Sequence, residues 1–456
     1  MKTFFEPSSA ALIGASSRPG RPGYHLFQNM LAGFGDRFYP VNPGTPRIGE
    51  TVCYPSVLAL PGPVDVAVVF IPAAAAPAAL EECAQKGIRR VIIESAGFAE
   101  TGPEGRALQE RCLAIARAGG MRLWGPNCMG LINVHRLQVL SFMLSTMWKD
   151  RFVKGPVALV VQSGMLSAGF LLQILSKTPF GLSKVASVGN KADVDEVDIL
   201  EYLVDDPETG VIAMYLESLG RGRRFLELAA GTDKPVVVLK AGRSASGAQA
   251  AASHTASLAQ DDAVVAAALR QAGVIRVRGM HELMDVARCL SVARRTKVTR
   301  PRVAILSFSG GAGVVCSDDL ADHGLELARL LPATTARLKT VFPEWMEPMN
   351  PVDLYPAIER NGPEKTFAVA LEAVMQDPGV DAVFAHLFAP PARVRLFDFD
   401  GFARLAQSGG KPFLVWVLGY GETCDQISRE LQARGIAVVD EIEKGARVLA
   451  ALTGGR

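Results

Sequence analysis

The chain has few of the features that would link it to a membrane, a nucleic acid or an oxidising compartment. Aromatic residues make up only 7% of the 456 residues, and the net charge is +2 with scattered basic residues. The sequence therefore lacks the basic patches and stacking aromatics of nucleic-acid-binding proteins. Glu6 and Pro7 break the short amino-terminal apolar stretch, and glycine, proline and polar residues interrupt the uncharged stretch 155–176. We expect no signal peptide, no membrane segment and no nucleic-acid partner.

Several site types are also missing. The seven cysteines are scattered, without the C-x-x-C spacing of zinc or redox sites, which indicates reduced thiols in the cytoplasm and no metal site on this chain. No G-x-x-x-x-G-K-[ST] loop is present, so no Walker-type nucleotide site is predicted. The first glycine turn is not G-x-G-x-x-G, because Ser16 stands where a glycine is required and no acidic ribose ligand follows. An NAD-dependent oxidoreductase is therefore a less favoured alternative.

What the chain does contain is a repeated pattern of apolar strands and helical segments. Apolar residues make up 49% and charged residues 21%, which suits sheets covered on both faces. The pattern breaks near 135–154 and again at the basic link 294–301, so the fold class is α/β with three domains, at 1–135, 150–295 and 301–456. The main predicted strands are 10–13, 37–41, 64–71, 90–94, 122–124, 156–161, 184–188, 211–215, 235–239, 274–277, 302–308, 382–388, 412–418 and 436–439.

Three strand-to-helix turns are suited to binding anions. They are Gly14 to Gly20, Gln162 to Met165 and Ser309 to Gly313. Each would present backbone N–H groups at the positive end of a helix, and glycine allows close approach of a phosphate. The second turn is not a G-x-S-x-G nucleophile elbow, because Val161 and Met165 stand where glycines are required. Ser163 is better interpreted as a phosphate ligand.

One histidine stands in a stretch of small residues. His254 lies between two hydroxyl residues in GRSASGAQAAASHTASLA, directly after the predicted strand 235–239. We expect a flexible loop there, with room for a bulky adduct on the imidazole, although a solvated loop histidine would have the same local composition. Glu217, at the end of the strand 211–216, is a candidate carboxylate to support that imidazole, or else a helix cap.

Taken together, these residues resemble the alpha subunit of the nucleoside-diphosphate-forming acyl-CoA synthetases, the superfamily of succinyl-CoA synthetase and ADP-forming acetate–CoA ligase. The resemblance covers nearly the whole chain. It implies a Rossmann-like CoA-binding domain followed by two flavodoxin-like, succinyl-CoA synthetase-type α/β domains. The motifs that carry it are IGASSRPG, YPVNPG, ESAGFAETG, GPNCMG, SVGNKADVDEVDIL and the SHT triplet at 253–255.

The resemblance implies a role for each candidate site residue. His254 would be the phosphorylated histidine and Glu217 the glutamate that supports it. The phosphoryl group would be held by Ser163, Gly164, Met165, Asn190 and Lys191. Coenzyme A would be held by Gly14, Ser16, Ser17, Arg18, Pro19, Gly20, Val41, Asn42, Pro43, Ile71, Pro72, Ser95, Ala96, Gly97 and Asn127.

The implied reaction converts acyl-CoA, phosphate and ADP into acid, CoA and ATP through an acyl phosphate and a phosphohistidine. The family's nucleotide site belongs to an ATP-grasp module, for which the three predicted domains leave no room. We therefore expect a separate ATP-grasp beta subunit that binds ADP or ATP and Mg²⁺, in an α2β2 or similar assembly. The substrate would be a small carboxylic acid or its acyl-CoA. The main alternative is a non-catalytic CoA or acyl-CoA regulatory protein.

Overall fold

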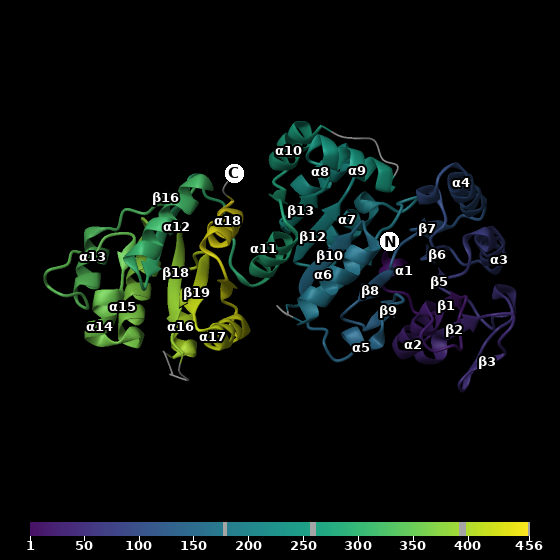
Figure 1. The fold of residues 1–456 in the computed structure, drawn as a ribbon, viewed down its shortest axis with the longest axis horizontal. Coiled ribbons are helices and arrows are strands. Elements are labelled where there is room, and N and C mark those ends of the chain that lie inside the picture. Colours follow the sequence, from purple (N-terminus) through teal and green to yellow (C-terminus); the bar gives the residue numbers. More distant parts are fainter. Residues whose placement is uncertain (177–179, 256–260, 392–397, 455–456) are drawn as a thin grey trace. The chain divides into compact units, whose positions relative to one another are not determined.

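The computed structural model describes residues 1–176, 180–255, 261–391 and 398–454, with the backbone alone described at 251–255. The chain forms two compact units, Met1–Ala287 and Arg288–Arg456 (Figure 1). The predicted domains 1–135 and most of 150–295 lie within the first unit. Among the described residues, no helix is long and apolar enough to cross a membrane.

The first sheet of unit 1 is fully parallel and has the strand order β2-β1-β5-β6-β7. Its central strands are completely buried, as the continuous apolar runs predict. The order reverses direction between β1 and β5, and open α/β sheets bind ligands at such a point. The elements of this part are α1 (Lys2–Phe5), β1 (Ala10–Ile13), α2 (Pro22–Phe34), η1 (Gly35–Arg37), β2 (Phe38–Val41), β3 (Arg47–Ile48), β4 (Thr51–Val52), η2 (Val57–Ala59), β5 (Val66–Val69), η3 (Ala73–Ala75), α3 (Ala76–Lys86), β6 (Arg90–Ile93), η4 (Ala99–Thr101), α4 (Pro103–Ala118) and β7 (Arg122–Trp124).

The second sheet has the order β14-β13-β12-β10-β11-β8-β9. The strands β8 and β9 come from the 131–140 segment, where no strand was predicted; β8 pairs antiparallel with β11, and β9 pairs antiparallel with β8. Each of these strands has three residues, which is too short to show the alternation of period two that predicts a strand. The elements are β8 (Leu131–Asn133), β9 (Gln138–Leu140), α5 (Ser145–Trp148), β10 (Lys154–Val161), α6 (Gly164–Ser176), β11 (Leu182–Ser187), α7 (Glu196–Asp205), β12 (Val211–Leu216), α8 (Gly222–Ala230), β13 (Val236–Lys240), α9 (Ala245–Thr255), α10 (Asp262–Gln271), β14 (Ile275–Val277) and α11 (Met280–Val292).

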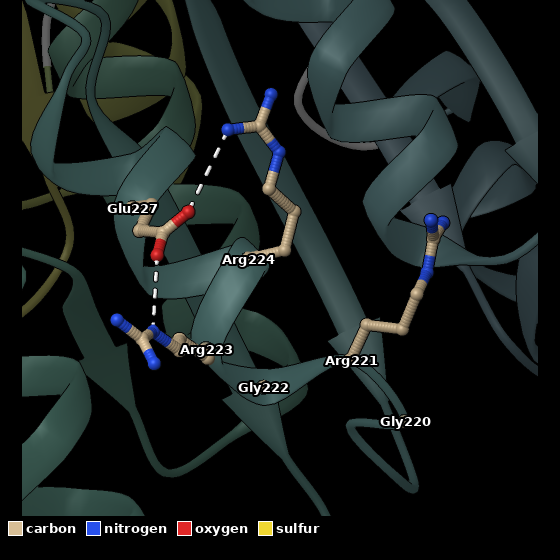
Figure 2. Close-up of a pocket in the computed structure, with 6 residues that line it drawn as sticks. All are labelled: Gly220, Arg221, Gly222, Arg223, Arg224 and Glu227. Carbon is tan, nitrogen blue, oxygen red and sulfur yellow. Dashed lines mark hydrogen bonds and ion pairs between the residues drawn. The ribbon is translucent and has the colours of Figure 1, made fainter.

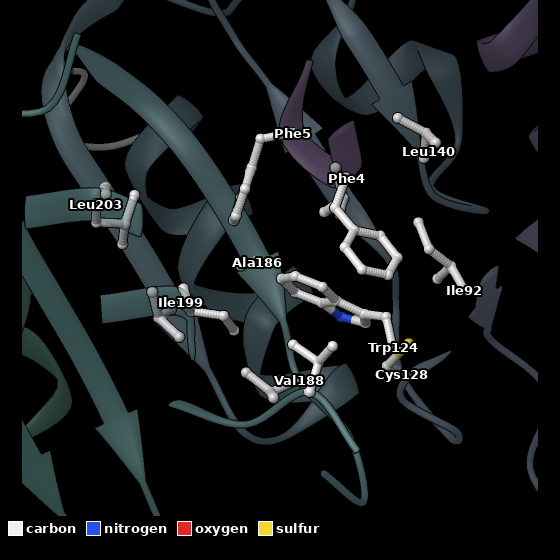
Figure 3. Close-up of a cluster of buried hydrophobic side chains, with 14 of the residues drawn as sticks. Phe4, Phe5, Ile92, Trp124, Cys128, Leu140, Ala186, Val188, Ile199 and Leu203 are labelled. Atoms are coloured by element: carbon white, nitrogen blue, oxygen red, sulfur yellow. The ribbon is translucent and has the colours of Figure 1, made fainter. Parts of the chain in front are cut away.

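The two sheets of unit 1 share one apolar core at their junction (Figure 3). Phe4 and Phe5 of α1 are fully buried against Trp124, with ring centroids 5.5 Å and 5.6 Å apart. Phe5 also stacks on Tyr202 of α7 at 4.5 Å. The Trp124 indole N–H donates to the carbonyl of Ser187 at 2.7 Å. The amino-terminal helix therefore fixes the end of β7 to the second sheet.

Unit 2 has its own core and a parallel sheet of order β16-β15-β18-β19-β20, with β17 paired to β15. The helices α12, α15, α16, α17 and α18 lie around its central strands (Figure 1). Its elements are β15 (Arg302–Ser307), α12 (Gly310–Asp322), β16 (Glu326–Leu327), α13 (Pro332–Lys339), β17 (Val352–Asp353), α14 (Tyr355–Asn361), α15 (Pro363–Gln376), β18 (Ala382–Ala389), α16 (Phe399–Ser408), β19 (Phe413–Gly419), α17 (Gly421–Ala433), β20 (Ala437–Val439) and α18 (Ile442–Thr453).

Candidate functional site

The turn from Gly14 to Gly20 lies at the carboxyl end of β1. Gly14 has φ +101°, and a Cβ there would lie 2.1 Å from the carbonyl oxygen of Phe70, so only glycine fits. Asn42 follows β2 and donates from its amide to the carbonyl of Ala15 at 2.7 Å. The Ser16 hydroxyl accepts from the backbone of Arg18 at 3.1 Å. No side chain caps the start of α2, whose positive end is suited to an anion, although the amides of Tyr24 and His25 already donate to the carbonyl of Arg21.

The ends of β5 and β6 are joined by one serine. Ser95 Oγ donates to the carbonyl of Ile71 at 2.6 Å and accepts from its N–H at 3.1 Å. The carbonyl of Ser95 in turn accepts from the backbone of Asn127 at 3.0 Å. Gly97 has φ +108° and donates to Glu100 at 2.6 Å. The predicted CoA residues at 71, 95–97 and 127 therefore meet at one edge of the first sheet.

Glu217 lies at the corresponding edge of the second sheet and is buried. The Gln162 side chain accepts from the backbone N–H groups of Glu217 at 2.8 Å and Ser218 at 3.2 Å, which links the ends of β10 and β12. Burial and the adjacent Glu217 raise the pKa of Tyr215 to about 12, so its hydroxyl keeps its proton and donates to Glu217 at 3.3 Å. Lys240 donates to the carbonyl of Glu217 at 2.8 Å.

The turn before α6 is partly exposed. Ser163 is half-buried, and its hydroxyl has no hydrogen-bond partner among the described residues. Gly164 begins the helix, while the Met165 side chain is 77% exposed. A free hydroxyl and unpaired amides at the start of a 13-residue helix are suited to a phosphoryl group. Met165 contributes its backbone position, since a thioether offers a phosphate no donor.

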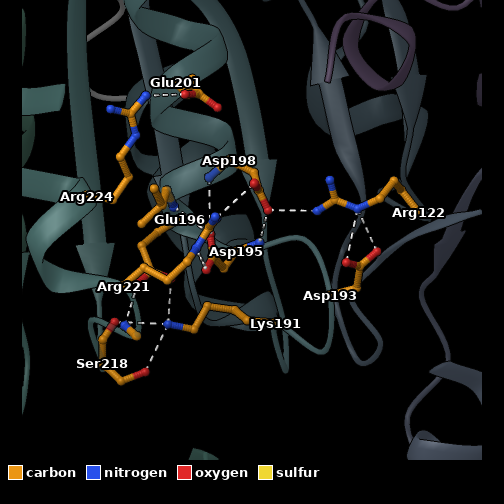
Figure 4. Close-up of polar contacts among 12 residues, drawn as sticks. Arg122, Lys191, Asp193, Asp195, Glu196, Asp198, Glu201, Ser218, Arg221 and Arg224 are labelled. Carbon is orange, nitrogen blue, oxygen red and sulfur yellow. Dashed lines mark hydrogen bonds and ion pairs between the residues drawn. The ribbon is translucent and has the colours of Figure 1, made fainter. Parts of the chain in front are cut away.

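The ammonium of Lys191 is hydrogen-bonded within the protein, unlike that of a lysine free to bind phosphate. Its ammonium donates to Glu196 at 2.8 Å and to the carbonyl and hydroxyl of Ser218 at 3.0 and 2.9 Å (Figure 4). A lysine ammonium has three N–H donors, so all of them are used. In this arrangement Lys191 positions Ser218 beside Glu217. The sequence offered no sign of this, because Glu196 reads as an ordinary residue of a helix N-terminus.

The loop after β7 and the loop after β11 join the carboxyl edges of the two sheets. Asn190 accepts from the Asn127 amide at 3.3 Å and donates to Glu100 at 2.6 Å. Gly189 has φ +65°, and a Cβ there would lie 2.2 Å from the carbonyl oxygen of Pro126. Arg122 on β7 also forms ion pairs with Asp193 and Asp198, each at 2.9 Å (Figure 4). The predicted CoA-binding and phosphate-binding residues therefore lie around a single junction inside unit 1.

The expectation of a flexible loop at His254 is wrong for its backbone. Residues Ala245–Thr255 form the helix α9, because five alanines with high helix propensity outweigh the serines and glycine. The helix contacts η4, which contains Glu100. His254 is thus on an element beside the junction. Its side chain lies outside the described residues, as does the end of the segment at 256–260.

A separate open depression of about 500 Å³ lies at the start of α8 (Figure 2). Its arginines are paired with carboxylates: Arg223 and Arg224 contact Glu227 at 3.2 and 3.6 Å, and Arg221 forms ion pairs with Asp195 and Asp198. Because carboxylates already neutralise these guanidinium groups, we place no anion site there. The lining residues are Gly220, Arg221, Gly222, Arg223, Arg224 and Glu227.

Comparison with known proteins shows the family. Residues 8–134 match a CoA binding domain and residues 154–290 a succinyl-CoA ligase like flavodoxin domain. The chain is 36% identical to the alpha subunit of the Pyrococcus furiosus enzyme acetate–CoA ligase (ADP-forming) II, over 98% of this chain and 96% of the relative. The chain belongs to the ADP-forming acyl-CoA synthetases. Proteins of this family are acid–CoA ligases. The first matched domain lies within unit 1, as does the second except for its residues 288–290.

Two further relatives match nearly the whole of this chain, and one of them is longer than it. The Archaeoglobus fulgidus enzyme acetate–CoA ligase (ADP-forming) II is 37% identical over 99% of this chain, which spans only 66% of that protein. The second is a solved structure from Candidatus Korarchaeum cryptofilum, described as dinucleotide forming acetyl-coenzyme A synthetase 1 in complex with phosphate and ADP. Its TM-score against this chain is 0.88. It is 30% identical, and the match covers 99% of this chain and 96% of that one. The predicted family and α/β fold class are confirmed.

Proposed function

We propose that the chain is the phosphohistidine-bearing subunit that converts an acyl-CoA and phosphate into an acid and CoA while loading His254. The observation that carries this proposal is the junction itself. Asn190 and Gly189, beside the turn of Ser163, pack on Asn127 and Pro126, beside the turn of Ser95. A thioester held at one edge and a phosphate held at the other would therefore meet.

The CoA site in this proposal is the carboxyl edge of the first sheet. The turn from Gly14 to Gly20, with Val41, Asn42 and Pro43, would hold the phosphorylated end of coenzyme A at the positive end of α2. Ile71, Pro72, Ser95 to Gly97 and Asn127 would guide the thiol toward the second sheet. The structural basis is the chain of hydrogen bonds from Ile71 through Ser95 to Asn127.

Phosphate would occupy the turn before α6. Ser163 and the amides of Gly164 and Met165 would bind its oxygens, while Asn190 would define the rim and Lys191 would hold Ser218 in place. Phosphate attacks the thioester carbonyl and CoA leaves, which gives an acyl phosphate. His254 then takes the phosphoryl group and releases the acid, with Glu217 stabilising the imidazole. Aligned donors contribute to each displacement because they need no rearrangement.

Discharge of the phosphohistidine onto ADP requires a nucleotide site. We propose that a separate ATP-grasp beta subunit provides it together with Mg²⁺, in an α2β2 or similar complex in the cytoplasm. The support is that the P. furiosus relative of matching length is named subunit alpha, whereas the A. fulgidus relative is longer than this chain. The domain bounds at 135, 150, 295 and 301 stay a prediction.

The test is reconstitution with the beta subunit and a panel of acids, with CoA-dependent ADP formation as the readout. We expect activity from the complex, with one class of small carboxylic acid preferred, and none from either subunit alone. Ser163→Ala should lower activity by about ten-fold or more, since one donor to the phosphoryl group is lost. CoA binding without ADP formation in every pairing would instead favour the regulatory protein.

A further inference from the structure

Glu94 has a buried carboxyl group. It follows β6 directly, its residue is 4% exposed, and neither carboxyl oxygen has a hydrogen bond among the described residues. A buried polar group without a partner costs about 1–3 kcal/mol, and such groups are concentrated at functional sites. Burial raises the pKa of Glu94 well above its usual range, and the nearby backbone of Phe142 offsets only part of this.

The residues around the Glu94 carboxyl belong to the junction. A Cβ on Gly130 would lie 2.4 Å from Glu94 Oε1, so the backbone of this glycine lies directly against the carboxyl. Cys128 is the titratable group that faces Glu94, and no cation among the described residues contributes to the pKa of Glu94. The pKa of the Cys128 thiol is itself raised by burial, so this thiol stays protonated.

The surroundings of Glu94 also border both predicted ligand sites. Ser95, the next residue after Glu94, carries the hydrogen bonds to Ile71. On the other side, a Cβ at Gly164 would lie 3.4 Å from the Met129 side chain, and Met129 donates from its backbone to Ser187 Oγ at 3.0 Å. Glu94 is therefore separated from the phosphate turn by the loop that covers it.

We propose that the Glu94 carboxyl exchanges the proton of the coenzyme A thiol, which deepens the proposed function and rests on it. In the synthetic direction, ionised Glu94 takes the thiol proton as sulfur forms its bond to the acyl carbon. The bond from that carbon to the phosphate oxygen breaks, and phosphate leaves with the electron pair. In reverse, phosphate attacks the thioester and the neutral carboxyl returns the proton to the departing thiolate. For this exchange, Gly130 has to move aside so that the carboxyl reaches the thiol.

A general base whose proton affinity approaches that of its substrate is the most effective one near neutral pH. An ordinary carboxyl group has a pKa far below that of a thiol, whereas burial brings the pKa of a carboxyl group closer to that of a thiol. The burial of Glu94 thus makes it a stronger base toward the thiol. Gly130 is required by its φ of +71° and also because a side chain there would meet the Glu94 carboxyl.

The experiment compares wild type with Glu94→Gln, which keeps the size of the side chain but has no acidic proton. In the reconstituted complex, acyl-CoA is formed from CoA and the acyl phosphate of the preferred acid. We expect Glu94→Gln to be about 100-fold slower at pH 7. Its rate should rise about ten-fold per pH unit, as hydroxide replaces the base, while wild type varies much less. Glu94→Leu should follow Glu94→Gln, and Cys128→Ala should behave as wild type.

A second readout separates this inference from the proposed function. Labelling of His254 by radioactive ATP through the beta subunit does not involve the thiol, so Glu94→Gln should label as wild type does. Failure of wild type to label would contradict the proposed function. Equal acyl-CoA rates and pH profiles for wild type and Glu94→Gln would overturn the role of Glu94. The role of Glu94 would also be overturned if Glu94→Gln lost both the labelling and the thiol step. The same holds if Cys128→Ala, and not Glu94→Gln, lost the thiol step.

Discussion

Removing the Phe5 ring should loosen unit 1 and leave unit 2 unchanged. The ring is fully buried, stacks on Tyr202 at 4.5 Å and contacts Trp124 at 5.6 Å. Trp124 lies on β7 of the first sheet, and Tyr202 lies on α7, between β11 and β12 of the second sheet in chain order. Phe5→Ala therefore removes a contact that joins the CoA-binding half to the half that carries His254.

The size of the effect follows from burial. A fully buried Phe→Ala change costs about 3–5 kcal/mol through lost transfer energy and the cavity left behind. Unit 1 spans residues 1–287. At an unfolding entropy of about 2.1 cal/mol/K per residue, that loss lowers the unfolding midpoint of the unit by about 5–8 °C.

Differential scanning calorimetry measures the midpoints, and hydrogen exchange assigns each transition to a unit. The matched control is Leu431→Ala, which removes a fully buried side chain from the core of unit 2. We expect Phe5→Ala to shift only the transition of unit 1 and Leu431→Ala only that of unit 2. A shift below about 2 °C for Phe5→Ala, or equal loss of protection in both units, would refute the reasoning.

Three further predictions concern the junction and the buried charges. Gly189→Ala should weaken acyl-CoA formation at least ten-fold with intact folding of unit 2, because its Cβ would lie 2.2 Å from the Pro126 carbonyl oxygen; steady-state kinetics check this. Lys184→Met should destabilise unit 1 by about 3–5 kcal/mol in urea unfolding, since the buried Asp206 loses the ammonium that lies 3.3 Å away and keeps its hydrogen bonds from Thr209 and the backbone of Glu208. Burial raises the pKa of Glu94, so the folded chain keeps a proton that the unfolded chain loses above its ordinary value of 4.5. Wild type should thus lose about 1.4 kcal/mol of stability per pH unit as pH rises through this window, relative to Glu94→Gln, and parallel pH profiles of unfolding would contradict it.

Local patterns predicted most of the parallel strands. Ala10–Ile13 and Arg122–Trp124 are strands with the bounds expected from the sequence, because their apolar runs end at glycine turns. The turns at Gly14 and Ser163 also lie at carboxyl strand ends, since every parallel strand of a sheet ends at the same edge. Short strands such as Gln138–Leu140 were missed, because three residues carry no periodicity.

The environment of the site depended on contacts between distant residues, which composition cannot show. Lys191 is followed by Glu196, but its attachment to Ser218 arises only when β11 and β12 flank β10. Glu94 looked like the last residue of a strand until Gly130 and Cys128 were seen to enclose it. At 245–255 the alanines, rather than the glycine and serines, decide the backbone.

The central claim is that His254 carries the phosphoryl group between two sites. The direct measurement incubates this chain and its beta subunit with ATP radiolabelled at the γ-phosphate and looks for acid-labile, base-stable phosphate on this chain. We predict one labelled site, His254, no label in His254→Asn, and release of the label by CoA together with the acid. Equal labelling of His254→Asn would contradict the account.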